Sequence, residues 1–293
     1  MPTVVVAAVV AEAENARLAA LPALGASYSF RRPYRSQTFR EQARFGALEI
    51  VADHYLYARG ERARELALLA EHFRLIPHAL ELSLGSADGI DADYLRALAG
   101  LIASVRAPWW SEHIAFTRAG GIRIGHLAPL PFTHEALDVV ARNVTRVRET
   151  IGTPLLLENI ACALAFPGAQ MREEDFLCAL VERTGCGLLL DVANLHANAL
   201  NLGYDPLEFI ASLPPESVVQ VHVAGGEWIG KEYVDGHARS VPEAVWELAE
   251  RVCKRFAVKA IVVERDENLP HFEELLAEVE RAHAIGARYG RWP

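Results

Sequence analysis

The chain has 293 residues, of which 52% are hydrophobic, and a formal net charge of -9 at pH 7. This length allows one large α/β domain, and the apolar content predicts a large core. The negative charge and the lack of a basic block argue against nucleic acid as the main partner. The four cysteines form no C-x-x-C pair, which argues against a thiolate-held metal and favours a reduced, cytoplasmic protein.

The first apolar run, from Val4 to Val10, has no preceding positive charge and is followed by Glu12 and Glu14. It is far shorter than the ~20 residues needed to span a bilayer, so we predict neither a signal peptide nor membrane association. We interpret residues 1–24 as an N-terminal arm of unknown role.

Short β-rich runs then alternate with amphipathic stretches of helical period. Candidate strands lie near residues 26–31, 47–53, 75–83, 107–116, 154–160, 186–192, 218–224 and 259–264. The candidate helices are residues 91–104, 133–152, 172–184, 242–256 and 271–288. This alternation predicts a single-domain TIM (β/α)8 barrel over residues 25–293. An open doubly wound sheet is the alternative, but it usually carries a G-x-G-x-x-G turn, which does not occur here.

Seven of the strand-like runs end in side chains that can bind a metal. The endings read ADH, IPH, SEH, LEN, LLDVAN, VHVAG and VERD. The residues concerned are Asp53, His78, Glu112, His113, Glu158, Asp191, His222 and Glu264. Because the C-terminal ends of barrel strands converge on one mouth, the pattern predicts a metal site there.

The last four of these residues give three carboxylates and one imidazole, a set that suits iron or manganese better than a structural zinc. A single strand-end acid is more often a helix cap or an arginine partner. Several carboxylates packed together would repel one another, and a cation is the simplest neutraliser.

In the N-terminal half, Glu112 and His113 are adjacent, so they point to opposite faces of a strand, and we choose His113 as the ligand. Asp235 and His237, in the loop expected after the seventh strand, add an acid and an imidazole. These candidate ligands outnumber the roughly six that surround one octahedral ion, so the sequence implies two or three ions. Trp109, beside the SEH ending, belongs either to the core or to the wall of the mouth.

Several strings occur in an order that resembles one enzyme family. They are LSLGSADGIDADYL, WSEH, GHLAPLPFTHEALD, LLLENI, RTGCGLLLDVANLHANALNLGYDP, VHVAGG, DGHA and VERD. Between residues 45 and 285 the chain is similar to the multinuclear non-haem iron-dependent oxidative enzymes. That family includes the enzyme of methanobactin biosynthesis and relatives that modify cysteines in ribosomally made peptides. It is a TIM-barrel family, distantly similar to xylose isomerase, with two or three irons in the barrel mouth.

The resemblance implies a ligand set of His78, His113, Glu158, Asp191, His222, Asp235, His237 and Glu264. Asp53, Asn159 and Asn194 lie beside these positions and are our candidate catalytic residues. The resemblance also implies that a mixed-valent Fe(II)/Fe(III) pair binds a substrate cysteine thiolate and activates O2. It further implies a small partner protein that presents the peptide.

The chain departs from the family pattern at two places. Asp53-His54-Tyr55 stands where many relatives carry Glu-Asn-Tyr or Glu-Asn-Phe, and Ala193 replaces the first Asn of their DVNN string. These differences bear on substrate contacts and on the occupancy of one iron.

Two other classes of function remain open. A xylose isomerase-like sugar isomerase or phosphodiesterase using manganese or zinc would share Glu158, Asp191 and Glu264. The number of imidazoles favours the oxidase, and the lack of a strand-end lysine weakens a sugar isomerase. A non-catalytic metal-dependent binding protein is the third hypothesis.

Overall fold

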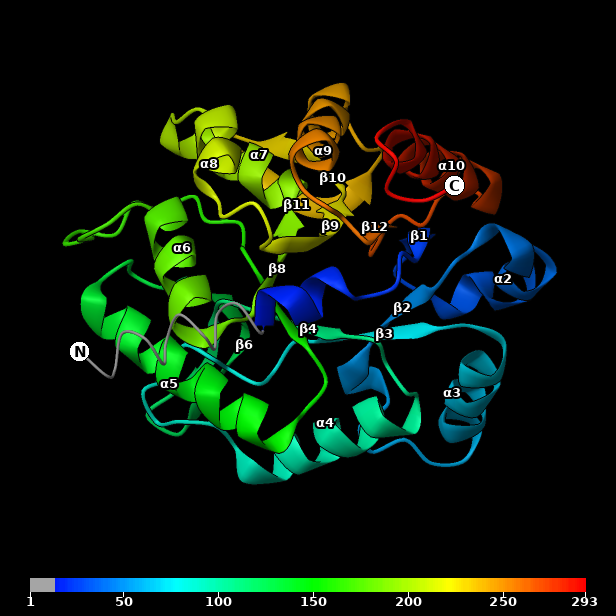
Figure 1. Cartoon of the computed structure of the whole chain (residues 1–293), viewed down its shortest axis with the longest axis horizontal. Helices are drawn as coiled ribbons and strands as arrows, with labels where there is room; N and C mark the ends of the chain where they lie inside the picture. Colours follow the sequence, from blue (N-terminus) through cyan, green and yellow to red (C-terminus); the bar gives the residue numbers. More distant parts are fainter. Residues whose placement is uncertain (1–13) are drawn as a thin grey trace.

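Eight parallel strands form a nearly closed barrel with helices between them, in a single domain (Figure 1). This computed structural model describes residues 14–293, so the run from Val4 to Val10 lies outside the described residues. The strand order around the barrel is β1-β12-β9-β8-β7-β4-β3-β2. The strands are β1 (Gly25–Tyr28), β2 (Leu48–Val51), β3 (Leu75–Ala79), β4 (Trp110–His113), β7 (Leu155–Glu158), β8 (Gly187–Asp191), β9 (Val218–Val223) and β12 (Ala260–Val263). The predicted TIM barrel is confirmed.

The barrel closes between its first two strands. Ser29 forms a parallel bridge with Glu49, and the Phe30 amide donates a hydrogen bond to the Glu49 carbonyl oxygen at 2.8 Å. This contact places β1 beside β2, so the C-terminal ends of all eight strands surround one opening, which we call the mouth.

The helices pack around the outside of the barrel, and those predicted from the sequence are all present. They are α2 (Arg35–Arg40), α3 (Glu61–His72), α4 (Ala92–Ser104), α5 (His134–Thr150), α6 (Glu173–Thr184), α7 (Val192–Leu202), α8 (Pro206–Ser212), α9 (Glu243–Arg255) and α10 (Phe272–Arg288). Thr133 caps α5, because its hydroxyl accepts the Ala136 amide at 3.1 Å. Three short 3-10 turns cover Arg32–Tyr34, Gln42–Arg44 and Ala52–His54. Within residues 14–293, no helix is both long and apolar enough to cross a bilayer.

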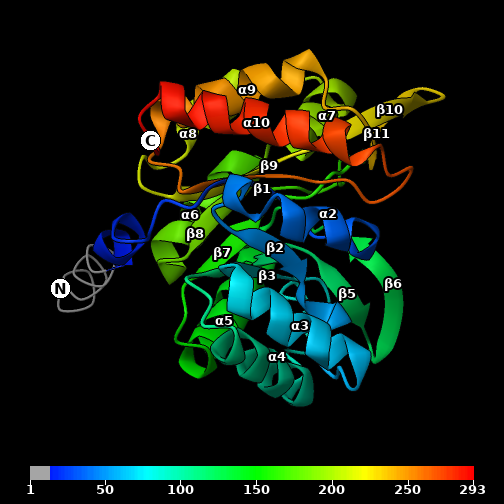
Figure 2. The same ribbon diagram turned by 90° about the vertical axis from the view of Figure 1, so that its right-hand side faces the viewer.

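Two antiparallel hairpins extend from the mouth and lie at the same end of the barrel (Figure 2). They are β5 (Phe116–Ala119) with β6 (Ile122–Ala128), and β10 (Gly225–Ile229) with β11 (Glu232–Arg239). The prediction of a loop around Asp235 and His237 was wrong, since both lie on β11. Two short β-rich runs flank Gly230-Lys231, and a two-residue connection with a glycine at φ 65° is typical of a tight hairpin.

Side chains inside the barrel form layers, because alternate residues of a strand share a face. Ile76, Trp109, Leu156 and Leu189 belong to a buried apolar cluster, and two residues further along their strands lie His78, Ser111, Glu158 and Asp191. Leu18 and Leu24, from the segment before β1, join the same apolar cluster. Figure 2 shows this segment and the hairpins at opposite ends of the barrel. The end away from the mouth is therefore a closed apolar plug.

Candidate metal centre

Eight acidic and histidine side chains meet at the mouth in three groups. The groups are His78, His113 and Glu158; Glu158, Asp191, His222 and Glu264; and Asp191, Asp235 and His237. Within each group, one candidate ligand atom per residue lies within 4.8 Å of the others. Because Glu158 and Asp191 each belong to two groups, the three groups form a continuous chain, which we call the mouth cluster. It contains all eight residues that the sequence indicated as metal ligands.

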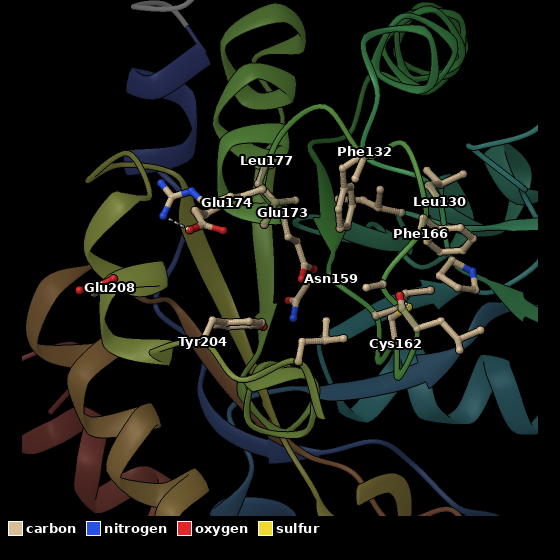
Figure 3. Close-up of a pocket in the computed structure, with 18 of the residues that line it drawn as sticks. Leu130, Phe132, Asn159, Cys162, Phe166, Glu173, Glu174, Leu177, Tyr204 and Glu208 are labelled. Atoms are coloured by element: carbon tan, nitrogen blue, oxygen red, sulfur yellow. Dashed lines mark hydrogen bonds and ion pairs between the residues drawn. The ribbon is translucent and has the colours of Figure 1, made fainter. Parts of the chain in front are cut away.

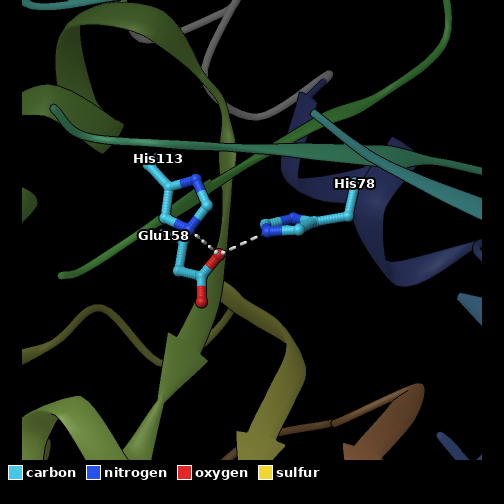
Figure 4. Close-up of side chains that lie close together, drawn as sticks. All are labelled: His78, His113 and Glu158. Carbon is cyan, nitrogen blue, oxygen red and sulfur yellow. Dashed lines mark ion pairs between the residues drawn. The ribbon is translucent and has the colours of Figure 1, made fainter. Parts of the chain in front are cut away.

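The first group comes from three neighbouring strands of the barrel, β3, β4 and β7. Glu158 Oε2 lies 3.4 Å from His78 Nε2 and 3.3 Å from His113 Nε2. Figure 4 shows both imidazole rings pointing at this one oxygen. The parallel register explains the meeting, since His113 is directly beside Glu158 and His78 is beside Ser111.

Each of these imidazoles has its second nitrogen next to a buried polar side chain. His78 Nδ1 lies 2.8 Å from Ser111 Oγ, and His113 Nδ1 lies 3.5 Å from Glu112 Oε1. Metal-ligating histidines are usually held in this way, because the partner fixes the tautomer and the ring orientation. The same arrangement recurs at His222, the central imidazole of the mouth cluster.

His222 is held by Glu49, a residue that the sequence analysis missed. His222 Nε2 lies 2.8 Å from Glu49 Oε2, which also accepts a hydrogen bond from Gln220 Nε2 at 2.7 Å. His222 Nδ1 is then left facing Glu158 Oε1 and Glu264 Oε2, each at 3.1 Å. Glu49 lies inside β2 rather than at its end, so the strand-end pattern could not find it. An acid within an otherwise apolar strand was the available signal.

Several carboxylate oxygens of the mouth cluster are buried and have no hydrogen-bond partner among residues 14–293. They are Glu158 Oε2, Asp191 Oδ2 and Asp235 Oδ1, and together they represent all three groups. A buried carboxylate oxygen without a hydrogen-bond donor is costly, and a bound cation would satisfy it. The donor set of four carboxylates and four imidazoles therefore fits divalent or trivalent metal ions.

The pKa shifts of the buried groups in the mouth cluster also indicate that positive charge is favoured there. Burial raises the pKa of Asp191 well above its usual range, and the nearby carboxylates of Asp235 and Glu158 add to the rise. Burial lowers the pKa of His222, but Glu264, Glu49 and Glu158 outweigh this effect and hold it well above its usual value. Positive charge is thus favoured at the centre of the mouth cluster, where imidazolium groups take the place that a cation would fill.

Two members of the third group, Asp235 and His237, lie on β11, and the third, Asp191, ends β8. His237 Nδ1 lies 3.0 Å from Asp266 Oδ2, and Asp266 also pairs with Arg31. His237 Nε2 contacts Asp235 Oδ2, and the backbone at His237 has φ 49°, which is unusual for a residue other than glycine. Neither Arg31 nor Asp266 was predicted. Arg31 ends the first candidate strand but is a cation and cannot bind a metal, and in the VERD ending Glu264 was chosen rather than Asp266.

The three candidate catalytic residues have different surroundings. The Asn159 side chain accepts the Asp191 amide at 2.9 Å and donates to the Asp191 carbonyl at 3.0 Å, so it joins the ends of β7 and β8. Asn194 donates to the Asn159 carbonyl at 3.1 Å. Asp53 lies outside the three groups, and its two oxygens accept the Leu80 amide at 2.9 Å and the Tyr94 hydroxyl at 2.8 Å.

Two pairs of adjacent residues lie in or next to β4, Glu112 with His113 and Trp109 with Trp110. Glu112 is directed away from the mouth cluster and accepts the Leu82 amide at 3.0 Å, whereas His113 points into it. Trp109 and Trp110 each belong to a buried apolar cluster, so both are core residues. The indole of Trp109 donates to Gln220 Oε1 at 2.7 Å inside the barrel.

A cavity of about 400 Å³ lies over the mouth cluster. Its lining includes six of the eight clustered residues, together with side chains from the hairpins and from the loops after β1 and β12. The hairpin side chains include Thr117 and His126, and the loop side chains include Arg31 and Asp266. This mouth cavity could admit part of a substrate and bring it directly to the mouth cluster.

The barrel is similar to several solved structures. A D-tagatose 3-epimerase-like protein has a TM-score of 0.57 at 16% identity, with 90% of this chain and 96% of that chain covered. D-psicose 3-epimerase from Clostridium cellulolyticum H10 has a TM-score of 0.53 at 10% identity, covering 90% and 96%. At these identities the similarity concerns the fold.

Sequence relatives are closer. A UPF0276 protein of Caulobacter vibrioides is 36% identical over 251 residues, which cover 86% of this chain and 90% of that protein. One from Streptomyces avermitilis is 42% identical over 221 residues, covering 73% of this chain and 45% of the longer relative. The family model described as RiPP precursor modification enzyme MbnB/TglH/ChrH matches residues 25–287. With this match over nearly the whole barrel, the chain belongs to the MbnB/TglH/ChrH family of RiPP precursor modification enzymes.

Proposed function

We propose that this protein is a multinuclear non-haem iron oxidase that modifies a cysteine of a ribosomally synthesised precursor peptide. The observation that carries the proposal is the continuous chain of three ligand groups that share Glu158 and Asp191. A carboxylate common to two groups can bridge neighbouring ions, and family membership supplies the peptide substrate. In the proposed reaction the cysteine is oxidised and O2 is reduced.

The mixed carboxylate and imidazole donors favour iron over the alternatives. Thiolates are absent from the three groups, which disfavours a structural zinc site, and the imidazoles disfavour magnesium or calcium. We propose two or three iron ions in mixed Fe(II)/Fe(III) states. Bound iron would supply open positions for the substrate thiolate and the electron transfer to O2.

We propose that the remaining residues orient the metal ligands or contact the peptide. Glu49 and Ser111 hold the imidazoles of His222 and His78, so that the other nitrogen of each ring faces the mouth cluster. Asn194 lines the mouth cavity, and we assign it a contact with the peptide. Asn159 and Asp53 have their polar atoms engaged within the protein, so their proposed role is to position the strand ends.

A small partner protein is proposed to present the peptide at the mouth. The two hairpins beside the mouth carry exposed apolar side chains, among them Ile122, Trp228 and Ile229. Such side chains are a common feature of protein interaction surfaces. The partner and the use of O2 rest on the family resemblance described above.

The test combines metal analysis with oxygen uptake. Protein purified without oxygen and reconstituted with Fe(II) is expected to bind at least two irons per chain. With the partner protein present, it should consume O2 only when given a peptide that contains cysteine, and not the same peptide with serine. Less than one metal per chain after reconstitution would overturn the proposal. Turnover of a free sugar that is indifferent to O2 would instead support the manganese or zinc isomerase.

A further inference from the structure

A second cavity, of about 270 Å³, lies beside the mouth. It is bounded by the loop after β7, by α6 and by the turn between α7 and α8. Figure 3 shows Phe132 and Phe166 on one side and Tyr204 on the other, with Leu177 of α6 between them. We call this space the side cavity, and nothing in the proposed metal chemistry uses it.

The side cavity adjoins the mouth cavity through residues that follow the proposed ligands. Ile114 comes directly after His113, and Asn159 comes directly after Glu158, and both line the side cavity. Ile160 lines both cavities, so one side chain forms a common wall. An extended peptide advances about 3.3–3.6 Å per residue, so the neighbours of a residue held at the mouth cluster come within reach of the side cavity.

The two cavities differ in their chemistry. Acids and imidazoles line the mouth cavity, whereas leucine, isoleucine, phenylalanine and alanine side chains supply most of the walls of the side cavity. Its lining also includes the exposed Arg172, Asp205 and Glu208, and Glu174, which pairs with Arg172. The acid of interest is Glu173, at the start of α6, which accepts a hydrogen bond from Asn198 Nδ2 at 3.4 Å. Burial raises the pKa of Glu173 to about 8, so the carboxyl group is largely protonated at neutral pH.

An empty apolar space of this kind favours an uncharged occupant. A lysine or arginine side chain would lose its hydration on entry and would meet a largely neutral Glu173. A leucine-sized side chain would instead remove apolar surface from water on both partners. Because the two cavities adjoin at Ile160, an occupant of the side cavity and the reacting residue can belong to one molecule.

We propose that the side cavity binds an apolar side chain of the substrate peptide, within about three residues of the cysteine that reaches the mouth cluster. This assignment rests on the proposed function, because it takes a peptide cysteine as the group at the mouth. The side cavity would then select among peptides, while the mouth cluster carries out the reaction.

The experiment uses synthetic peptides with a single cysteine in a glycine and serine background. One leucine, lysine or aspartate is placed at each of the three positions before and after the cysteine, and one peptide has serine in place of cysteine. Affinity for the anaerobic, iron-reconstituted full-length protein is measured by fluorescence anisotropy. Leucine at one or two positions is expected to strengthen binding by about 10-fold or more over serine.

Two variants narrow the side cavity from different sides. Ala169→Phe acts from the exposed loop, and Leu177→Phe acts from α6. Either is expected to reduce the leucine preference to about 3-fold or less, because the added ring occupies the space. Ala103→Phe, which places the same ring on an exposed position of α4, is the matched control and should keep the preference.

The possible outcomes separate the side cavity from the proposed function. Binding that depends on cysteine but shows no leucine preference, or a preference unchanged by both phenylalanine variants, would overturn the side-cavity proposal alone. A preference for lysine would also overturn it and would assign Glu173 as an anionic partner. Binding that is indifferent to cysteine would overturn the proposed function, and the side-cavity proposal with it.

Discussion

The two ends of the barrel carry opposite kinds of side chain on the same strands. At the plugged end, Ile76, Trp109 and Leu156 pack into a buried apolar cluster. At the mouth, two residues further along, His78, Ser111 and Glu158 are polar and equally buried. The apolar end stabilises the fold, and the polar end is costly without a cation. Inward-facing residues two positions apart on the same strand therefore stabilise the fold at one end and form the candidate metal centre at the other.

The largest difference between the ends is expected in metal content. Glu158→Ala and Asp191→Ala each remove a residue shared by two groups, so each variant should lose at least one iron more than His237→Ala, which affects one group. Elemental analysis of reconstituted variants measures iron per chain. Wild-type iron content in Glu158→Ala or Asp191→Ala would end the metal-centre assignment. Equal losses in all three would remove only the distinction between shared and unshared ligands.

At the plugged end, Trp109→Ala should lower the free energy of unfolding by about 3–5 kcal/mol, because it opens a cavity in the core. The change also leaves Gln220 Oε1 without its indole donor. Denaturant unfolding measures the loss, and iron content should stay at the wild-type value in the folded protein. Trp109→Phe, which keeps most of the volume, should lose less. A Trp109→Ala protein that is stable but poor in iron would show that the two ends are not separable.

Glu49 lies between the two ends, and Glu49→Gln tests whether it belongs to the mouth. Weakening the partner of His222 Nε2 should reduce metal affinity by about 10- to 100-fold, which corresponds to about 1.4–2.7 kcal/mol. Competition with a chelator measures this affinity. Glu65→Gln removes another buried carboxylate, which pairs with Arg32, and should lower stability without changing metal affinity. Equal metal affinities in the two variants would make Glu49 a purely structural residue.

The smallest effect concerns Glu173 in the side cavity. Because burial raises its pKa from 4.5 to about 8, the folded protein binds a proton that the unfolded chain releases, and stability falls as the pH rises through this interval. Glu173→Gln should remove this fall, so that its stability relative to wild type increases between pH 5 and pH 8. Unfolding curves at both pH values measure the change. Glu208→Gln, at an exposed position of the same cavity, should show no such increase.

The sequence alone determined the barrel and the residues at its mouth. Alternating apolar strands and amphipathic helices are local patterns, and the rule that strand ends converge turns them into a site. Glu158, Asp191, His222 and Glu264 could therefore be placed together from their positions alone. Local alternation along one strand also indicated that only one of Glu112 and His113 could point into the mouth.

Only the tertiary structure decided which residues are shared, which residues support them, and what lies beside the mouth. The sharing of Glu158 between groups depends on the register of three strands, and the contact between Glu49 and His222 crosses the barrel interior. The side cavity arises where loops and helices distant in sequence leave a space. Such distances are set by register and barrel closure, which involve pairs of residues far apart in the chain, whereas sequence patterns report the periodicity of one segment at a time.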